Sequence, residues 1–174
     1  MRRSAAAVGS AVFFVVAPGV VAGLVPWLIS GWQLPRLTSP LAILRLAAGV
    51  VLLALAVVVL VRAFARFVVE GGGTPAPVAP TERLVVGGDY RFVRNPMHLA
   101  VVIAVLGQAM IFGSLALLGY ALAVWAITAA FVHWYEEPKL LERYGDEYQR
   151  YRDAVRAWVP RLRPWQADIG HAGK

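Results

Sequence analysis

The sequence predicts an all-α integral membrane protein with about four transmembrane helices, a C-terminal helical hairpin and an interfacial amphipathic tail helix. Hydrophobic residues make up 59% of the chain and charged residues only 16%, whereas soluble domains average about 25% charged residues. The charges also gather between apolar runs long enough to cross a bilayer, which takes about 20 residues. We expect one membrane domain: two helices in residues 1–70, a cytoplasmic loop in 71–94, and the hairpin with its cytoplasmic tail in 95–174.

The first crossing is expected within residues 4–35, which contain no charged side chain. This run is longer than the apolar core of a secretory signal peptide, which has about 7–15 residues, so the segment should remain as a transmembrane helix. Pro18 and Pro26 each remove one backbone hydrogen bond. They predict a kink near Pro18 or an early end near Pro26, followed by an external loop over residues 32–40.

The second crossing is expected at residues 41–61, a run rich in Leu, Val and Ala. Its single charge, Arg45, lies near the outer end and is interpreted as an interface anchor without a role in a site. Residues 71–80 contain a glycine run and three prolines, which predict a loop. No GK[ST] motif follows the glycines, so we exclude a phosphate-binding loop.

A helical hairpin is expected from residues 95–135, which contain no Asp, Glu, Lys or Arg and could cross a bilayer twice. Asn95 is a favoured N-cap and Pro96 suits the first helical position, so the third helix should begin there. We expect its turn at Gly113-Ser114, and Gly119-Tyr120 is the competing position. The hairpin would bring the polar clusters at its two ends to the same side of the membrane.

The tail beyond residue 135 is predicted to form an amphipathic, interfacial helix that ends at Pro160. Aromatic and apolar residues recur at helical spacing in this tail: Tyr144, Tyr148, Tyr151 and Val155. The positive-inside rule places both chain ends in the cytoplasm, because 15 of the 17 Lys and Arg residues then lie inside. We therefore expect a plasma-membrane protein whose excess of positive charge reflects topology and lipid contact, with no nucleic-acid partner.

Several kinds of site are excluded by composition. The chain has no cysteine, which rules out disulfides, zinc–cysteine sites and thiol nucleophiles. Its three histidines, His98, His133 and His171, are too few for the histidine-rich boxes of di-iron membrane oxygenases. We therefore expect no metal site, and interpret His98 and His133 as proton acceptors or hydrogen-bonding groups.

Two polar clusters are candidates for chemistry. Arg94, Asn95 and Pro96 combine a guanidinium with a helix N-terminus, which favours an anion such as a carboxylate or phosphate. A capped helix with an arginine anchor is the alternative. Glu136 and Glu137 directly follow an apolar run, where ionised carboxylates are costly unless paired or hydrated. They would bind hydroxyls, an amine or a cationic ligand, or would simply be solvated at the interface.

As an ordered set, these motifs resemble the isoprenylcysteine carboxyl methyltransferase and phospholipid methyltransferase superfamily. The resemblance covers residues 74–160, half of the chain. It rests on Gly-x-Tyr at 88–90, Arg-x-Pro at 94–96, the apolar hairpin, Glu-Glu at 136–137, and Leu140, Tyr144-Gly145, Tyr148, Tyr151, Val155 and Pro160. Asn95 stands where the eukaryotic pattern has histidine, and His98 where it has tyrosine.

The resemblance implies an integral membrane enzyme that uses S-adenosylmethionine to methylate a lipophilic, isoprenylcysteine-like or lipid-like acceptor. Arg94, Glu136 and Glu137 are then expected to carry catalysis. The cofactor would be bound by these three residues together with Tyr90, Asn95, Pro96, His98, His133 and Tyr148. Methyl transfer needs mainly the positioning of donor and nucleophile, which agrees with the absence of an elaborate acid–base motif.

Two alternatives stay open at the level of sequence. One is an NADPH-dependent, sterol-reductase-like membrane enzyme, a class that resembles the same hairpin and tail but tends to be longer. The other is a non-enzymatic membrane protein with a degenerate site. The sequence makes no prediction of the acceptor's identity or of the oligomeric state.

Overall fold

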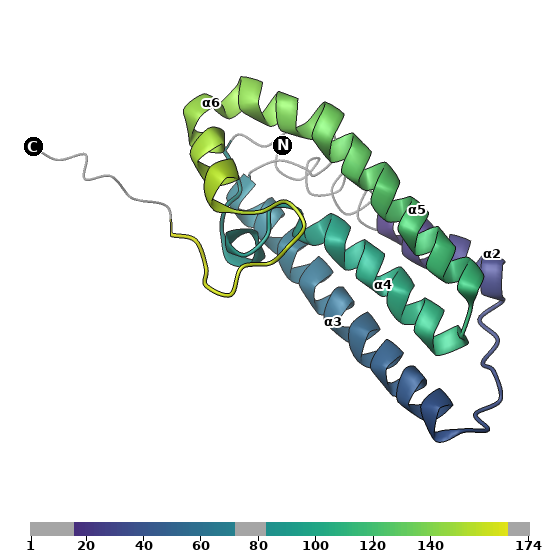
Figure 1. Cartoon of the computed structure of the whole chain (residues 1–174). Helices are drawn as coiled ribbons and strands as arrows, with labels where there is room; N and C mark the ends of the chain where they lie inside the picture. Colours follow the sequence, from purple (N-terminus) through teal and green to yellow (C-terminus); the bar gives the residue numbers. More distant parts are fainter. Residues whose placement is uncertain (1–15, 72–82, 167–174) are drawn as a thin grey trace, which may run out of the picture.

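The computed structural model describes residues 16–71 and 83–166, and within these ranges every regular element is a helix (Figure 1). The all-α prediction is confirmed for this part of the chain. The elements are η1 (Val20–Leu24), α2 (Val25–Ser30), α3 (Pro40–Gly71), η2 (Gly88–Arg91), α4 (Pro96–Phe112), α5 (Leu115–Phe131), η3 (Val132–Glu136) and α6 (Glu137–Ala154). The predicted proline-rich loop at residues 71–80 lies almost wholly outside the described residues.

Two helices are long and apolar enough to cross a membrane, Pro40–Arg66 and Leu115–Ala154, and two shorter apolar helices accompany them, Val16–Ser30 and Pro96–Phe112. In an apolar 18-residue window of each long helix, only 11% and 22% of the residues are buried inside the molecule. The core helix of a soluble protein would be mostly buried, whereas large side chains such as Leu44, Leu55 and Leu122 face outward here. Such exposed apolar surface fits a lipid environment.

The first helix is irregular between Pro18 and Pro26, and it continues past Pro26 to Ser30, so it does not end at that proline. Residues Val20–Leu24 form a π-helical turn just before Pro26, and the helix ends at Ser30. Proline has no N–H to donate, so nearby carbonyls need other donors. Gln108 Nε2 donates to the carbonyl of Ala22 (2.6 Å) and the Tyr120 hydroxyl donates to that of Val21 (3.0 Å). These two bonds tie the first helix to α4 and α5.

Helices α3 and α4 approach each other closely at two glycines. A Cβ atom on Gly49 would lie 2.7 Å from the carbonyl oxygen of Gly107, and one on Gly107 would lie 2.9 Å from that of Gly49. Small residues at such a crossing let backbones pack directly, as is common between membrane helices. This contact fixes the position of α4, whose first turn carries Pro96 and His98.

The hairpin has the predicted turn. Gly113 adopts a left-handed conformation (φ +61°) after α4, and the Ser114 hydroxyl accepts from the N–H of Leu117 at the start of α5. The competing turn at Gly119-Tyr120 is wrong, because both residues lie inside α5. Helix α4 begins at Pro96 after Asn95, as predicted, although the Asn95 side chain makes no capping hydrogen bond.

The tail differs from the prediction in its connection to the hairpin. No loop separates the two, because α5 continues through the π-helical turn η3 into α6, and the helix then breaks within α6 at Gly145 (φ +50°, ψ −127°). Tyr148, Tyr151 and Val155 are buried on its inner face, which confirms the amphipathic pattern. At about 1.5 Å per residue, the 30 residues before this break span roughly 45 Å, more than the apolar thickness of a bilayer, so the charged residues of α6 extend beyond it.

Candidate functional site

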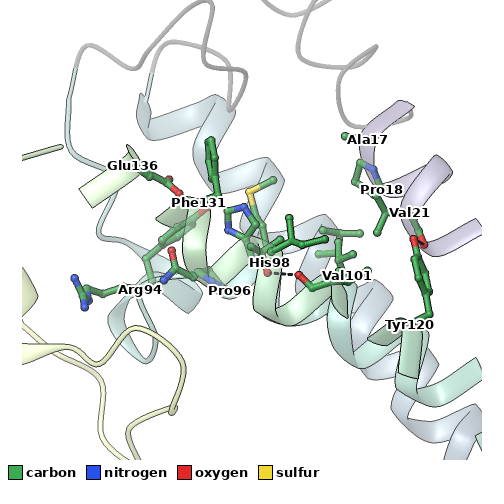
Figure 2. Close-up of a pocket in the computed structure, with 17 residues that line it drawn as sticks. Ala17, Pro18, Val21, Arg94, Pro96, His98, Val101, Tyr120, Phe131 and Glu136 are labelled. Carbon is green, nitrogen blue, oxygen red and sulfur yellow. Dashed lines mark hydrogen bonds between the residues drawn. The ribbon is translucent and has the colours of Figure 1, made fainter. Parts of the chain in front are cut away.

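A cavity of about 490 Å³ lies between the first helix, α3, α4 and α5 (Figure 2). Arg94 and Glu136 lie at one end of it, whereas Pro18, Val21 and Tyr120 lie at the other. We call the first part the polar end; it is lined by Tyr90, Arg94, Asn95, Pro96, Met97, His98 and Glu136. We call the second part the apolar arm; it is lined by Ala17, Pro18, Val21, Leu60, Val101, Tyr120, Val124, Ile127, Thr128 and Phe131.

Arg94 is held by a pair of partners from α6. Its Nη1 atom lies 2.9 Å from Oε1 of Glu137 and donates a hydrogen bond to the Tyr148 hydroxyl at 3.1 Å. The Arg94 and Glu137 side chains are each only 12% exposed, so their charges are largely withdrawn from water. Burial raises the pKa of Tyr148 to about 12, despite the opposing effect of Arg94, so this hydroxyl stays protonated at neutral pH. We call Arg94, Glu137 and Tyr148 the paired cluster.

Glu136 has different surroundings from its neighbour. Its carboxylate lines the cavity, and its buried Oε2 atom has no hydrogen-bond partner among the residues described. Burial raises the pKa of this carboxyl above its usual 4.5, opposed by His98 and reinforced by Glu137. A buried carboxylate without a partner is costly, and such groups in clefts are typical of binding or catalytic sites.

His98 lies in the first turn of α4 and also lines the cavity. Its ring makes an edge contact with Trp158, with centroids 6.5 Å apart, and Trp158 makes a second edge contact with Trp125. The tail thus contributes an aromatic side chain beside the site, which was not predicted from the sequence. No spacing rule connects Trp158 with His98, because the contact depends on how residues 155–165 fold back.

Residues 155–165 return along the segment that precedes α4. The N–H groups of Arg94 and Arg161 donate to the carbonyls of Arg156 and Phe92, at 3.0 and 2.8 Å. The Asn95 side chain donates to the carbonyl of Ala157 at 3.2 Å. Asn95 is buried, and its side chain therefore holds the tail in place as well as lining the cavity.

The structure brings together most of the residues that the sequence singled out. Those lining the cavity are Tyr90, Arg94, Asn95, Pro96, His98 and Glu136. Glu137 and Tyr148 do not line it, and contact Arg94 instead. His133 is exposed and packs edge-on against Trp134, away from the cavity lining. Within the described residues, no group of three or more His, Cys, Asp or Glu side chains could hold a metal ion.

The residues of the apolar arm were not identified as site residues from the sequence. Tyr120, Val124, Ile127, Thr128 and Phe131 follow one another at short helical intervals, so they form one stripe of α5. That spacing was visible in the sequence. It was not informative there, because the lipid-facing side of the same helix is equally apolar.

A comparison with known protein families gives this geometry a context. The sequence profile of the phospholipid methyltransferase family matches residues 44–147, more than half of the chain. The match begins in α3, includes Arg94, the hairpin and both glutamates, and stops one residue before Tyr148. No curated protein matches the chain. The family match confirms the resemblance drawn from the ordered motifs, and the chain belongs to the phospholipid methyltransferase family of membrane methyltransferases.

Proposed function

We propose that the protein transfers a methyl group from S-adenosylmethionine to a lipophilic acceptor at the membrane. The observation that carries this proposal is the buried Oε2 atom of Glu136, which has no hydrogen-bond partner among the described residues and belongs to a carboxylate that lines the cavity in a chain of a methyltransferase family. A cavity of about 490 Å³ is within the range of about 300–1,000 Å³ that is typical of small-molecule sites.

The charges at the polar end fit this donor. The carboxylate of Glu136 suits a positively charged ligand group, and S-adenosylmethionine carries a sulfonium and an amine. The first turn of α4 and the adjacent Arg94 suit the donor's carboxylate, since helix N-termini attract anions. Nε of Arg94 is buried and has no hydrogen-bond partner in the described parts of the chain. Glu137 and Tyr148 would act indirectly, because they orient Arg94.

When bound, the donor supplies an electrophilic methyl carbon, which an acceptor lone pair attacks while the carbon–sulfur bonding pair stays on sulfur as a neutral thioether. The chain's own residues position the reactants and set the local charge, which can supply much of the rate. The apolar lining excludes water from this space. Any proton that the acceptor releases can pass to the His98 imidazole, whereas the exposed His133 is not placed to receive it.

We also propose that the site faces the cytoplasm in a plasma membrane. The start of α3 and the α4–α5 turn lie at one end of the bundle, and η2 and α6 lie at the other (Figure 1). The second end carries most of the basic residues, which favours the cytoplasmic side. Single cysteines at Ser39 and Ser114 should react with an impermeant reagent from outside; labelling only from inside would contradict this orientation.

A thermal-shift comparison tests the function. S-adenosylhomocysteine at 100 times its Kd should stabilise the purified protein by about 2.7 kcal/mol, whereas NADPH should have no effect. Stabilisation by NADPH alone would favour a reductase, and no response to either would favour a degenerate site. Incubating membranes with a donor carrying a radiolabelled methyl group, and identifying the labelled lipid-soluble product, would then reveal the acceptor.

A further inference from the structure

The apolar arm extends the site deep into the helical bundle. Its α5 stripe runs from Phe131, near the polar end, to Tyr120. These residues are 11 positions apart, or about 17 Å along a helix axis. The opposite wall consists of Pro18 and Val21 of the first helix and Val101 of α4 (Figure 2). The arm is therefore an elongated space that is continuous with the polar end.

The two hydroxyl groups in this arm are already engaged by backbone carbonyls. Thr128 Oγ1 donates to the carbonyls of Val124 and Trp125, at 2.8 and 3.0 Å. The Tyr120 hydroxyl donates to the carbonyl of Val21 at 3.0 Å. The hydrogens of both hydroxyl groups are therefore already used, and the rest of the lining is apolar. Such a surface pairs poorly with the charged or hydroxyl-rich parts of S-adenosylmethionine.

Tyr120 lies at the end of the arm that is farthest from Glu136. Its hydrogen bond to Val21 joins α5 to the first helix and closes the space between them. Val124, one helical turn nearer to the polar end, is buried in the α5 face that lines the arm. By contrast, Leu122 is 59% exposed and faces away from the cavity, so it serves as a matched control on the same helix.

We propose that the apolar arm binds a single apolar tail of the methyl acceptor inside the bundle, and that Tyr120 sets the longest tail that fits. This inference rests on the proposed function. The acceptor is then an amphiphile with its nucleophile at one end of an apolar chain. Because the cavity of about 490 Å³ also has to hold the donor, it has room for one chain, and a second chain would have to stay in the bilayer.

Crosslinking tests where the tail lies. The probe is dodecylamine with a photoreactive diazirine at the end of its chain, added to the full protein in nanodiscs containing S-adenosylhomocysteine. After illumination, mass spectrometry should find adducts on Val21, Val124 or Tyr120. Val124→Trp should remove most of this labelling, at least tenfold, and Leu122→Trp should leave it unchanged. Adducts confined to outward-facing residues such as Leu122, or equal labelling of both variants, would overturn the proposal.

Chain length tests the role of Tyr120. Across a series of alkylamines that compete with the probe, each added methylene should lower the free aqueous concentration needed for competition about fourfold, which corresponds to about 0.8 kcal/mol, until the tail reaches Tyr120. Tyr120→Ala should move this limit to longer chains and Val124→Trp to shorter ones. An unchanged limit in both variants would contradict the proposal. Stabilisation by S-adenosylhomocysteine, measured on the same samples, reports separately on the proposed function, because that assay involves no tail.

Discussion

Glu136 and Glu137 are neighbours in sequence but occupy opposite kinds of environment. Glu137 lies 2.9 Å from Arg94 and is part of the paired cluster. Glu136 lines the cavity, and its Oε2 atom has no hydrogen-bond partner in the part of the chain that the structure describes. The two residues therefore have different roles: the Glu137 carboxylate holds Arg94 in place, and the Glu136 carboxylate remains available for a ligand.

Arg94→Ala should have the largest effect on stability. It leaves the Glu137 carboxylate buried without its partner, and breaking a buried ion pair costs about 3–5 kcal/mol. Unfolding in detergent micelles, followed by temperature or denaturant, measures the loss. Arg62→Ala is the matched control, because Arg62 pairs with Asp89 at 3.2 Å but is 64% exposed; its cost should stay below about 1 kcal/mol. Equal losses in the two variants would contradict the buried pairing.

Glu136→Gln should separate binding from stability. Removing the negative charge should weaken S-adenosylmethionine binding by about 10-fold to 100-fold, or about 1.4–2.7 kcal/mol, as measured by calorimetry. Stability should hold or rise, because the variant no longer buries a carboxylate oxygen that lacks a hydrogen-bond partner among the described residues. Glu142→Gln, at an exposed position of α6, should change neither property. A loss of stability without a loss of affinity would reverse the roles assigned to the two glutamates.

Tyr148→Phe should have a smaller effect on the paired cluster. It removes one hydrogen bond to a charged group, worth about 1.5–3 kcal/mol, while the Arg94–Glu137 contact remains. The stability of the variant should also depend differently on pH in alkaline solution. The folded-state pKa of Tyr148 is raised to about 12 from 10. The stability that this shift contributes is fully present below pH 10 and is lost as the pH rises towards 12. A wild-type alkaline transition that is unchanged in the variant would refute this role.

The contribution of Glu136 to the pH dependence of folding stability should be the smallest of these effects. Because burial raises its folded-state pKa above 4.5, the folded protein holds this proton more tightly than the unfolded chain. The resulting stability is present below pH 4.5 and is lost as the pH rises through the folded-state pKa. Acidification from neutral pH should therefore stabilise the wild type relative to Glu136→Gln. Parallel pH profiles of the two proteins in thermal unfolding would argue against a buried carboxyl.

The local parts of the fold could be predicted from the sequence. The start of α4 at Pro96 and the turn at Gly113-Ser114 follow from backbone preferences of the residues themselves. Each of these features depends on a few adjacent residues, so composition and spacing were sufficient.

The partition of roles within the site could not be predicted in the same way. The π-helical turn η3 lies just before α6 and changes the helical phase of the residues after it, so it decides which glutamate faces Arg94 and which faces the cavity. The contact of Trp158 with His98 depends on the return of residues 155–165 along the start of α4. Both outcomes require the tertiary arrangement, which the order of the motifs does not contain.

The most direct test of this account is methyl transfer itself. Purified protein in nanodiscs made from native lipids is incubated with S-adenosylmethionine carrying a tritiated methyl group, and label in the lipid-soluble fraction is counted. The wild type should produce labelled product, and Glu136→Gln should produce far less at subsaturating donor while remaining folded. Transfer at the wild-type rate by a folded Glu136→Gln protein would contradict the role of the unpaired carboxylate. An absence of transfer by the wild type, in lipids that contain its acceptor, would contradict the proposed function.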